Sequence, residues 1–283
     1  MKKLFSIVLA ALMVAALFAG CGSSTAETKA PETTAAPATE AAAPAETEAP
    51  AETEAAAAFT TIEAGKLIMS TNAAFPPYEM VADDGSFEGI DVEIAGAIAK
   101  KLGLELVVDD MDFDAALLAV QQGKSDIVMA GVTVNEDRKM VMNFSDTYSK
   151  GVQVVIVKEG SDVTLDNLGD QMIGTQRGTT GYIYTSGDYG EDHVTAYDNG
   201  ASAVQALMNG QVDCVVIDSA PAKAFVEANP GLTILDTEYT SEDYAIGMNK
   251  DNTALLDAVN AALAELTADG TIPAIVEKYI PTK

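Results

Sequence analysis

"AVQQGKSDIVMAG", at residues 119–131, decides the fold, because the chain repeats its pattern at residues 206–218 as "ALMNGQVDCVVID". Each copy reads as the end of a helix, a glycine stop, an acidic residue and an apolar strand. The aligned pairs are Gly123 with Gly210 and Asp126 with Asp213. Chance similarity between two helix–strand units is one interpretation. The other is a pair of lobes of like architecture, each built on an open α/β sheet.

The segments before the first copy alternate between strand and helix patterns. "GKLIMSTN" (65–72) and "LELVVDD" (104–110) read as strands, whereas "IDVEIAGAIAKKLG" (90–103) places its apolar residues on one helical face. We expect Asp91 to cap the start of that helix and Gly103 to close it. This alternation predicts an α/β fold with parallel strands and crossover helices.

Two later segments are expected to join the lobes. An apolar extended run follows "NEDRK" (135–139) and is expected to pass into the second lobe, and "SEDYAIGMN" (241–249) is expected to return. The helical pattern at 252–279 is then expected to pack on the first lobe. Two crossing strands form a hinge, and a hinge makes a closable cleft. The predicted lobes are 59–149 with 246–283, and 150–245.

The first 58 residues read as an export signal and a tether. Lys2 and Lys3 precede an apolar run that ends at Cys21, which resembles a bacterial lipoprotein signal with a lipidated cysteine. An ordinary secretory signal or an uncleaved anchor is the alternative. Residues 22–58 carry no apolar side chain larger than alanine apart from proline, so burial cannot offset their ordering entropy. The predicted segments are a signal peptide at 1–20 and, at 21–58, the lipidated cysteine with a disordered tether.

Composition excludes several classes of function. The formal net charge of −27 argues against a nucleic-acid partner and against a basic membrane-docking patch. One histidine and two cysteines give little support to a zinc site, a Ser–His–Asp site or a disulfide framework. We therefore expect no cofactor, no metal and no catalysis. Cys214, in an apolar strand, is expected to be a buried and inert thiol.

Arg138 is a candidate anion receptor. Of the 16 lysines and arginines, only Arg138 and Arg177 are arginine. A guanidinium is a rigid fork of donors that fits a carboxylate with two parallel bonds. Open α/β sheets bind ligands beyond the carboxyl ends of their strands, and Arg138 lies a few residues past the first such end. A structural salt bridge to Glu136, Asp137 or a distant acid is the alternative.

Other candidates lie at the same level of the predicted sheets. Asp218 ends the second repeated strand, where it can bind an ammonium group or cap the next helix. Phe75, in "FPPYEM", and Phe113 can wall a pocket, although core packing is the usual explanation for such aromatics. Arg177, in "QRGTTG", is expected to shape a turn rather than contact a ligand.

These motifs, in this order, resemble the extracytoplasmic amino-acid-binding proteins of bacterial ABC importers, of the polar-amino-acid type. The resemblance spans about residues 62–281. It implies a two-lobed periplasmic-binding-protein-like fold, with two open α/β sheets joined by two hinge strands. The motifs that carry it are "FPPYEM", "GIDVEIAGAIAKKLG", "FDAALLAVQQGKSDIVMAGVTVNEDRK", "NFSDTY", "IGTQRGTTG", "GQVDCVVID" and "ADGTIPAIVEKY".

The resemblance also implies roles for particular residues. Arg138 would grip the ligand α-carboxylate with support from Thr133, and Asp218 would bind the α-ammonium. Ala130 and Gly131 would lend backbone groups to the ligand head. The remaining implied contacts are Thr179 and Thr180 in the "GTT" turn, Phe75 and Phe113 as an aromatic sandwich, and Gln176 and Asn72 as side-chain selectors.

The implied function is binding of a free polar amino acid and its delivery to an ABC permease. Relatives that take cationic or amide side chains commonly carry an acid where this chain has Asn72, so we expect a neutral polar ligand. The expected protein is a monomer, lipid-anchored at the outer face of the bacterial cell membrane. The alternatives are a dehydratase-like enzyme on the same fold and an amino-acid sensor.

Overall fold

The computed structural model describes residues 59–236 and 238–281, which all belong to one compact unit, Glu52–Lys283. The predicted signal peptide at 1–20, the lipidated Cys21 and the tether at 21–58 lie outside the described residues. Within the described ranges, no helix is both long enough and apolar enough to cross a membrane.

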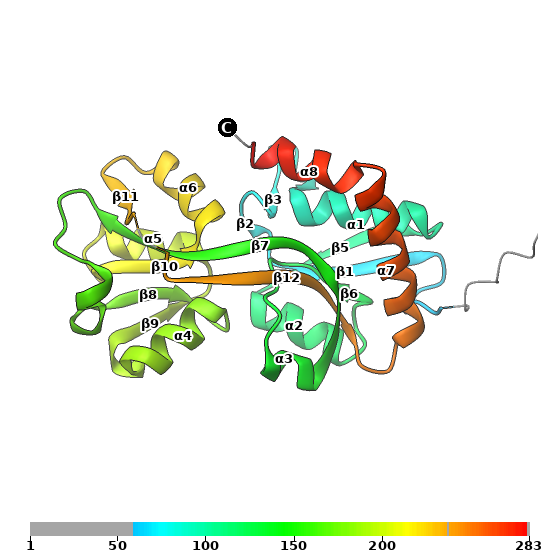
Figure 1. Ribbon diagram of the computed structural model, residues 1–283, viewed down its shortest axis with the longest axis horizontal. Helices are drawn as coiled ribbons and strands as arrows, with labels where there is room; N and C mark the ends of the chain where they lie inside the picture. The colour runs from blue at the N-terminus through cyan, green and yellow to red at the C-terminus, as the bar shows by residue number, and fades with distance from the viewer. Residues whose placement is uncertain (1–58, 237, 282–283) are drawn as a thin grey trace, which may run out of the picture. The chain divides into compact units, whose positions relative to one another are not determined.

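The described elements fall into two groups that two long strands connect (Figure 1). The first group contains β1 (Lys66–Thr71), β2 (Ala74–Phe75), β3 (Glu79–Val81), β4 (Phe87–Glu88), α1 (Ile90–Lys101), β5 (Glu105–Asp110), α2 (Phe113–Gln121), β6 (Ile127–Val128), α3 (Glu136–Val141), α7 (Thr253–Ala268) and α8 (Thr271–Tyr279). The second contains η1 (Leu165–Asp170), β8 (Ile173–Gln176), α4 (Thr180–Tyr189), η2 (Glu191–His193), β9 (Val194–Tyr197), α5 (Gly200–Met208), β10 (Cys214–Asp218), α6 (Ser219–Ala228) and β11 (Leu232–Ile234). We call these groups the first half and the second half.

The connecting strands are β7 (Met142–Lys158) and β12 (Thr240–Asn249), which pair antiparallel. They link both halves into a hydrogen-bonded path of order β5-β1-β6-β12-β7-β10-β8-β9, with β11 paired to β7. Ser149 pairs with Tyr244 and Thr147 with Ala245, so Tyr148 is the extra residue of a bulge in β7. The predicted crossing strands and their directions are confirmed.

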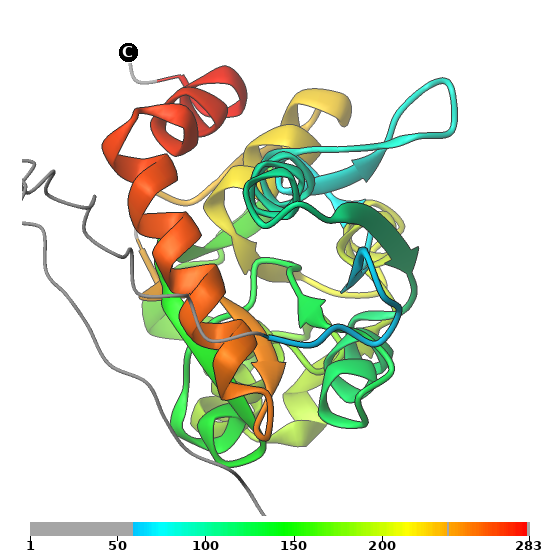
Figure 2. The same ribbon diagram turned by 90° about the vertical axis from the view of Figure 1, so that its right-hand side faces the viewer.

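Each half has its own hydrophobic core. In the first half, Leu67 and Met69 of β1 pack with Ile94 and Ile98 of α1. Helix α7 joins this core through a stripe that includes Leu255, and Figure 2 shows this helix in orange along β7 and β12. The second half buries residues of β10 and α5 in a separate cluster. The C-terminal helical segment therefore packs on the first half, as the sequence predicted.

The repeated pattern has a physical basis in both halves. Gly123 and Gly210 end α2 and α5 with φ of 66° and 72°, a conformation that favours glycine. The Asp126 carboxylate accepts the N–H of Ile68 at 2.8 Å, and Asp213 accepts that of Met172 at 2.8 Å. Strand β6 then pairs parallel with β1, as β10 does with β8. The two copies therefore form helix–strand units of like structure, one in each half.

Three local predictions were wrong. Asp91 does not cap α1, because the N-cap is Gly89, whose Cβ would lie 2.3 Å from the Tyr78 carbonyl oxygen at a φ of 127°. Asp91 lies instead in the first turn, fully buried. The C-terminal helix breaks at Gly270, with φ of 85°. The apolar strand predicted at the end of "AVQQGKSDIVMAG" (119–131) shortens to β6, because the chain leaves the sheet after Val128.

Candidate functional site

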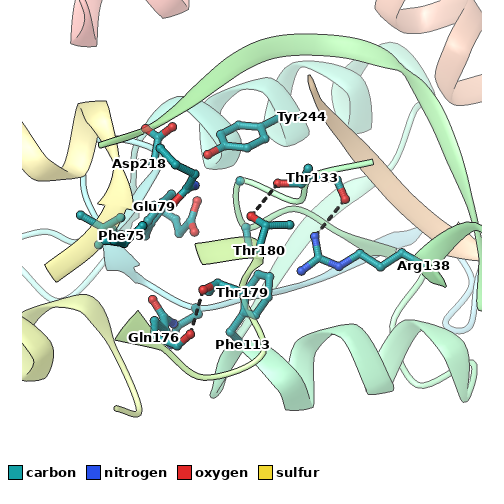
Figure 3. Close-up of a pocket in the computed structure, with 16 residues that line it drawn as sticks. Phe75, Glu79, Phe113, Thr133, Arg138, Gln176, Thr179, Thr180, Asp218 and Tyr244 are labelled. Atoms are coloured by element: carbon teal, nitrogen blue, oxygen red, sulfur yellow. Dashed lines mark hydrogen bonds between the residues drawn. The ribbon is translucent and has the colours of Figure 1, made fainter. Parts of the chain in front are cut away.

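One pocket gathers side chains from both halves of the described structure (Figure 3). All eleven residues predicted from the sequence line it: Asn72, Phe75, Phe113, Ala130, Gly131, Thr133, Arg138, Gln176, Thr179, Thr180 and Asp218. Five further residues line it that the sequence did not single out: Glu79, Gln153, Val216, Ile217 and Tyr244. The carboxyl ends of β6 and β10 both lead into this pocket, as expected for open α/β sheets.

Arg138 is held at one end of the pocket by backbone groups. Asn135 caps α3 by accepting the Arg138 backbone N–H at 2.8 Å, which orients the first turn. The guanidinium donates from Nη1 to the Thr133 carbonyl oxygen at 2.9 Å and lies 5.4 Å from the centre of the Phe113 ring. Its exposed fraction is 7%, and burial lowers the pKa of Arg138 while nearby Glu242 opposes that shift. An arginine stays charged in such a setting.

Arg138 has no carboxylate partner among the ion pairs of residues 59–236 and 238–281. The alternative of a salt bridge to Glu136 or Asp137 is therefore wrong, and Glu136 instead pairs with Lys139 at 2.9 Å. The guanidinium instead contacts carbonyl oxygens and the Phe113 ring, and the charge of Glu242 acts on it without an ion pair. This arrangement leaves a buried cation ready for an anion.

Asp218 supplies an opposite charge at another wall of the pocket. Its Oδ1 accepts the Ala220 N–H at 2.9 Å, so it does cap α6, and its Oδ2 accepts the Val152 N–H at 2.8 Å. Burial raises the pKa of Asp218 to about 6, while hydrogen bonds from Ala220, Tyr244 and Val152 oppose the shift. The interpretation as a helix cap is confirmed, and the cap positions a buried acid at the pocket wall; ammonium binding by Asp218 stays a prediction.

Tyr244 closes the wall beside Asp218, and a glycine makes room for both. A Cβ at Gly151 would lie 2.4 Å from the Tyr244 hydroxyl oxygen and 2.7 Å from Asp218 Oδ2. Gly131 similarly has a φ of 54°, and a Cβ there would lie 2.9 Å from the Phe75 ring. Side chains larger than hydrogen are therefore excluded at two backbone positions beside the pocket.

Three hydrogen bonds join the halves across the pocket. Arg138 Nη2 donates to the Gly178 carbonyl oxygen at 3.1 Å, and the hydroxyls of Thr133 and Thr180 lie 3.4 Å apart. The amide groups of Asn72 and Gln176 meet as well. Gln176 Nε2 donates to Asn72 Oδ1 at 3.0 Å, and Asn72 Nδ2 donates to the Met111 carbonyl oxygen at 2.9 Å. The structure thus shows a closed arrangement of the two halves.

The residues that the sequence left outside the site also lie outside the pocket. Arg177 is exposed and pairs with Asp198 at 3.2 Å, which agrees with a turn-shaping role. Cys214 is buried, and burial raises the pKa of its thiol to about 12, as expected for an inert cysteine. Among the described residues, no group of three or more His, Cys, Asp or Glu side chains could hold a metal ion.

Glu79 and Tyr244 were missed although both lie in stretches that the sequence had marked. Glu79 belongs to "FPPYEM", and Tyr244 to the returning strand "SEDYAIGMN". A strand shows its two faces only when its partner and register are known. The signal that could have identified Glu79 is a lone acid between apolar residues directly after a rigid Pro-Pro loop.

Comparisons with known proteins agree on one family. Residues 67–282 match the model of "Bacterial extracellular solute-binding proteins, family 3". The chain is 33% identical over 231 residues to a probable histidine-binding protein of Neisseria gonorrhoeae, covering 79% of this chain and 86% of the relative. It is 30% identical over 221 residues to the L-cystine-binding protein TcyJ of Escherichia coli (strain K12), covering 77% of this chain and 83% of the relative. Among solved structures, an ancestral arginine-binding protein bound to glutamine has a TM-score of 0.74 and 39% identity, covering 77% of this chain and 99% of that one.

Proposed function

The chain belongs to the bacterial extracellular solute-binding proteins, family 3, and on that premise we propose that its pocket binds one free amino acid for delivery to an ABC permease. Similar proteins are named for histidine and cystine, and a similar arginine-binding structure holds glutamine. The family consists of binding proteins, and we propose that this chain too binds without catalysing a reaction.

The observation that carries this proposal is the pair of opposite charges in the pocket. Arg138 is buried without a carboxylate partner in the described part of the chain, and Asp218 is a buried acid on another wall. A free amino acid carries a carboxylate and an ammonium on one carbon. We assign the carboxylate to Arg138, with Thr133, Thr179 and Thr180 as additional donors, because a guanidinium fork fits it bidentately. The ammonium is assigned to Asp218.

The remaining predicted residues are assigned to the rest of the ligand. Ala130 and Gly131 offer backbone groups to its head, and Phe75 and Phe113 offer ring faces to its side chain. The buried amides of Asn72 and Gln176 offer both donors and acceptors but no charge. We therefore propose a polar ligand with a neutral side chain, for which these amides exchange their mutual hydrogen bond for contacts with the ligand.

The proposed cycle uses the two halves as rigid lobes, at 59–149 with 246–283 and at 150–245, hinged on β7 and β12. The amino acid enters an open cleft, and closure over it excludes water and strengthens both charge contacts. The closed monomer then docks on the permease. The family is extracellular. A signal peptide at 1–20 and a lipid on Cys21 would hold the protein at the outer membrane face, where the tether raises its effective concentration near the permease.

A thermal-shift screen of the purified protein against the twenty amino acids and cystine tests the proposal. At a ligand concentration one hundred times the dissociation constant, binding adds about 2.7 kcal/mol to the free energy of unfolding. We expect one or a few polar neutral amino acids to raise the melting temperature, and Arg138→Ala to abolish the shift. If no amino acid raises it, the proposed function is wrong.

A further inference from the structure

A second acidic group lies in the pocket beside the proposed head-group site. Glu79, on β3, lines the pocket and has an exposed fraction of 1%. Within residues 59–236 and 238–281, neither of its carboxyl oxygens has a hydrogen-bond partner. Figure 3 shows Glu79 on the Asp218 side, away from Arg138. An unpartnered carboxyl is costly to bury, so its presence in a pocket wall calls for a proton or a ligand.

Asp91 of α1 lies behind Glu79. Its Oδ2 accepts the Gly131 N–H at 2.9 Å and the Tyr148 hydroxyl at 2.8 Å, whereas its Oδ1 has no partner. Gly131 belongs to the pocket wall and Tyr148 is the bulge residue of the crossing strand β7. The Asp91 carboxylate therefore accepts hydrogen bonds from both the pocket wall and the crossing strand β7.

The negative charge of Asp91 acts on Glu79, and neither Glu79 oxygen has a hydrogen-bond partner in the described part of the chain. Two buried carboxylates without a cation do not both stay ionised, so one of them holds a proton. Burial raises the pKa of Glu79 well above its ordinary value, and the negative charges of Asp91 and Asp110 add to that shift. Burial raises the pKa of Asp91 to about 6, although hydrogen bonds from Gly131 and Tyr148 oppose that shift. The proton therefore resides on Glu79.

The groups that face this pair offer no cation to replace the proton. Among the described residues, the titratable groups that act on the pair, or on the phenols against it, are Asp110 of β5, Tyr78 before β3, Tyr148 of β7 and Asp218 at the end of β10. All are acids or phenols. A positive charge that enters this end of the pocket would be the first one there.

The ligand brings such a charge. An ammonium group has three N–H donors, and Asp218 already accepts one backbone N–H on each of its oxygens. Asp218 alone leaves part of the ammonium without a strong acceptor. Glu79 is the unused acceptor on the same side of the pocket.

We propose that the Glu79 carboxyl holds a proton in the unliganded protein, and that the ligand ammonium displaces this proton by binding between Glu79 and Asp218. The inference rests on the proposed amino-acid function. The proton leaves the Glu79 carboxyl for water, and the Glu79 carboxylate then accepts an N–H of the ammonium. Asp91 keeps its bonds to Gly131 and Tyr148, so it acts as a positioning residue while Glu79 contacts the ligand.

The test is titration calorimetry in two buffers of different ionisation enthalpy at about pH 8. The probe is whichever of L-glutamine, L-histidine, L-arginine and L-cystine raises the melting temperature most. At that pH an acid with a pKa of about 6 is almost fully ionised, so Asp218 and Asp91 contribute little. We expect the wild-type protein to release about one proton for each amino acid bound.

Two variants separate the proposal from a purely structural role. Glu79→Gln keeps the shape of the side chain but has no carboxyl proton to lose, so it should bind the amino acid more weakly and without proton release. Glu88→Gln removes the same charge from an exposed position on the neighbouring β4, and it should release as many protons as the wild type. Equal release by Glu79→Gln and wild type would overturn the proposal.

An infrared measurement needs no variant. The absorption of a protonated, buried carboxyl should be present in the unliganded wild type and disappear on saturation with the same probe. If the probe binds while this band persists, the proton stays and the inference is wrong although the proposed function stands. If no amino acid binds at all, the proposed function is wrong, and this inference, which rests on it, is wrong as well.

Discussion

The ends of β6 and β10 are equivalent positions that deliver opposite charges. Both strands follow a helix, a glycine in the left-handed region and an aspartate that accepts a backbone N–H from the adjacent segment of the same sheet. After β6 the chain continues as a loop and a short helix, α3, which presents the cation Arg138. After β10 the helix α6 begins at once, with the anion Asp218 as its cap.

The two strands are alike, and the difference lies in the segment that the chain forms after each of them. A carboxylate is stabilised directly at a helix N-terminus, where unpaired N–H groups point at it. A long guanidinium needs a separate support, which the Thr133 carbonyl and the Phe113 ring supply. A duplicated unit thus yields a pocket with a positive and a negative wall, which suits a zwitterion.

The largest expected effect comes from removing the cation of this pair. Arg138→Ala should weaken amino-acid binding by about 2–5 kcal/mol, because it leaves the ligand carboxylate buried without its partner. Arg138→Lys should also lose affinity, since an ammonium cannot form two parallel bonds. Calorimetry measures both. Arg177→Ala is the matched control, because Arg177 pairs with Asp198 on the surface, and its affinity should equal that of the wild type.

A smaller effect is expected from the anionic wall, and it depends on pH. Burial raises the pKa of Asp218 from 3.8 to about 6, so the unliganded fold holds this proton more tightly than the unfolded chain. Its contribution to stability is full below about pH 4 and is lost as pH rises through about 6. Relative to Asp218→Asn, the wild type should therefore lose up to about 3 kcal/mol of unfolding free energy between about pH 4 and pH 8. Denaturant unfolding of both unliganded proteins at several pH values measures this difference. A difference that stays constant with pH would show that Asp218 is ionised in the fold as easily as in the unfolded chain.

The sequence predicted the parts of the pocket that lie at the ends of regular patterns. Local patterns placed Arg138 and Asp218 near the carboxyl ends of the predicted strands. These patterns were the apolar strands, the glycine stops and an arginine in a strand-end loop. The family motifs added nine further pocket residues. These residues lie where the chain leaves a strand or enters a helix. Such positions follow from local patterns and need no knowledge of long-range pairing.

The residues that the sequence could not predict depend on pairing over long distances. Gln153 and Tyr244 face the pocket from β7 and β12, whose register includes a bulge that no local pattern reveals. Asp91 was predicted to cap its helix, but the N-cap is Gly89. Only glycine fits at that position, because a Cβ there would clash with the Tyr78 carbonyl oxygen. The true partners of Asp91, including Tyr148, lie far away in the sequence.

The smallest expected effect comes from alanine substitutions at the equivalent glycines of the two repeated units. They test whether units with similar backbones contribute equally to the free energy of unfolding. Gly123 and Gly210 have nearly the same positive φ, and a Cβ at Gly123 meets nothing within 4 Å, whereas one at Gly210 meets only the end of the Lys158 side chain at 3.7 Å. Alanine at either site therefore meets no steric clash. Its only cost is the left-handed backbone conformation, which is unfavourable for a residue with a Cβ by about 1–2 kcal/mol. Gly123→Ala and Gly210→Ala should lower the free energy of unfolding by equal amounts, as measured by denaturant titration, and leave amino-acid affinity unchanged. Unequal losses would mean that the halves differ already in the helix–strand unit, before the chain reaches Arg138 or Asp218.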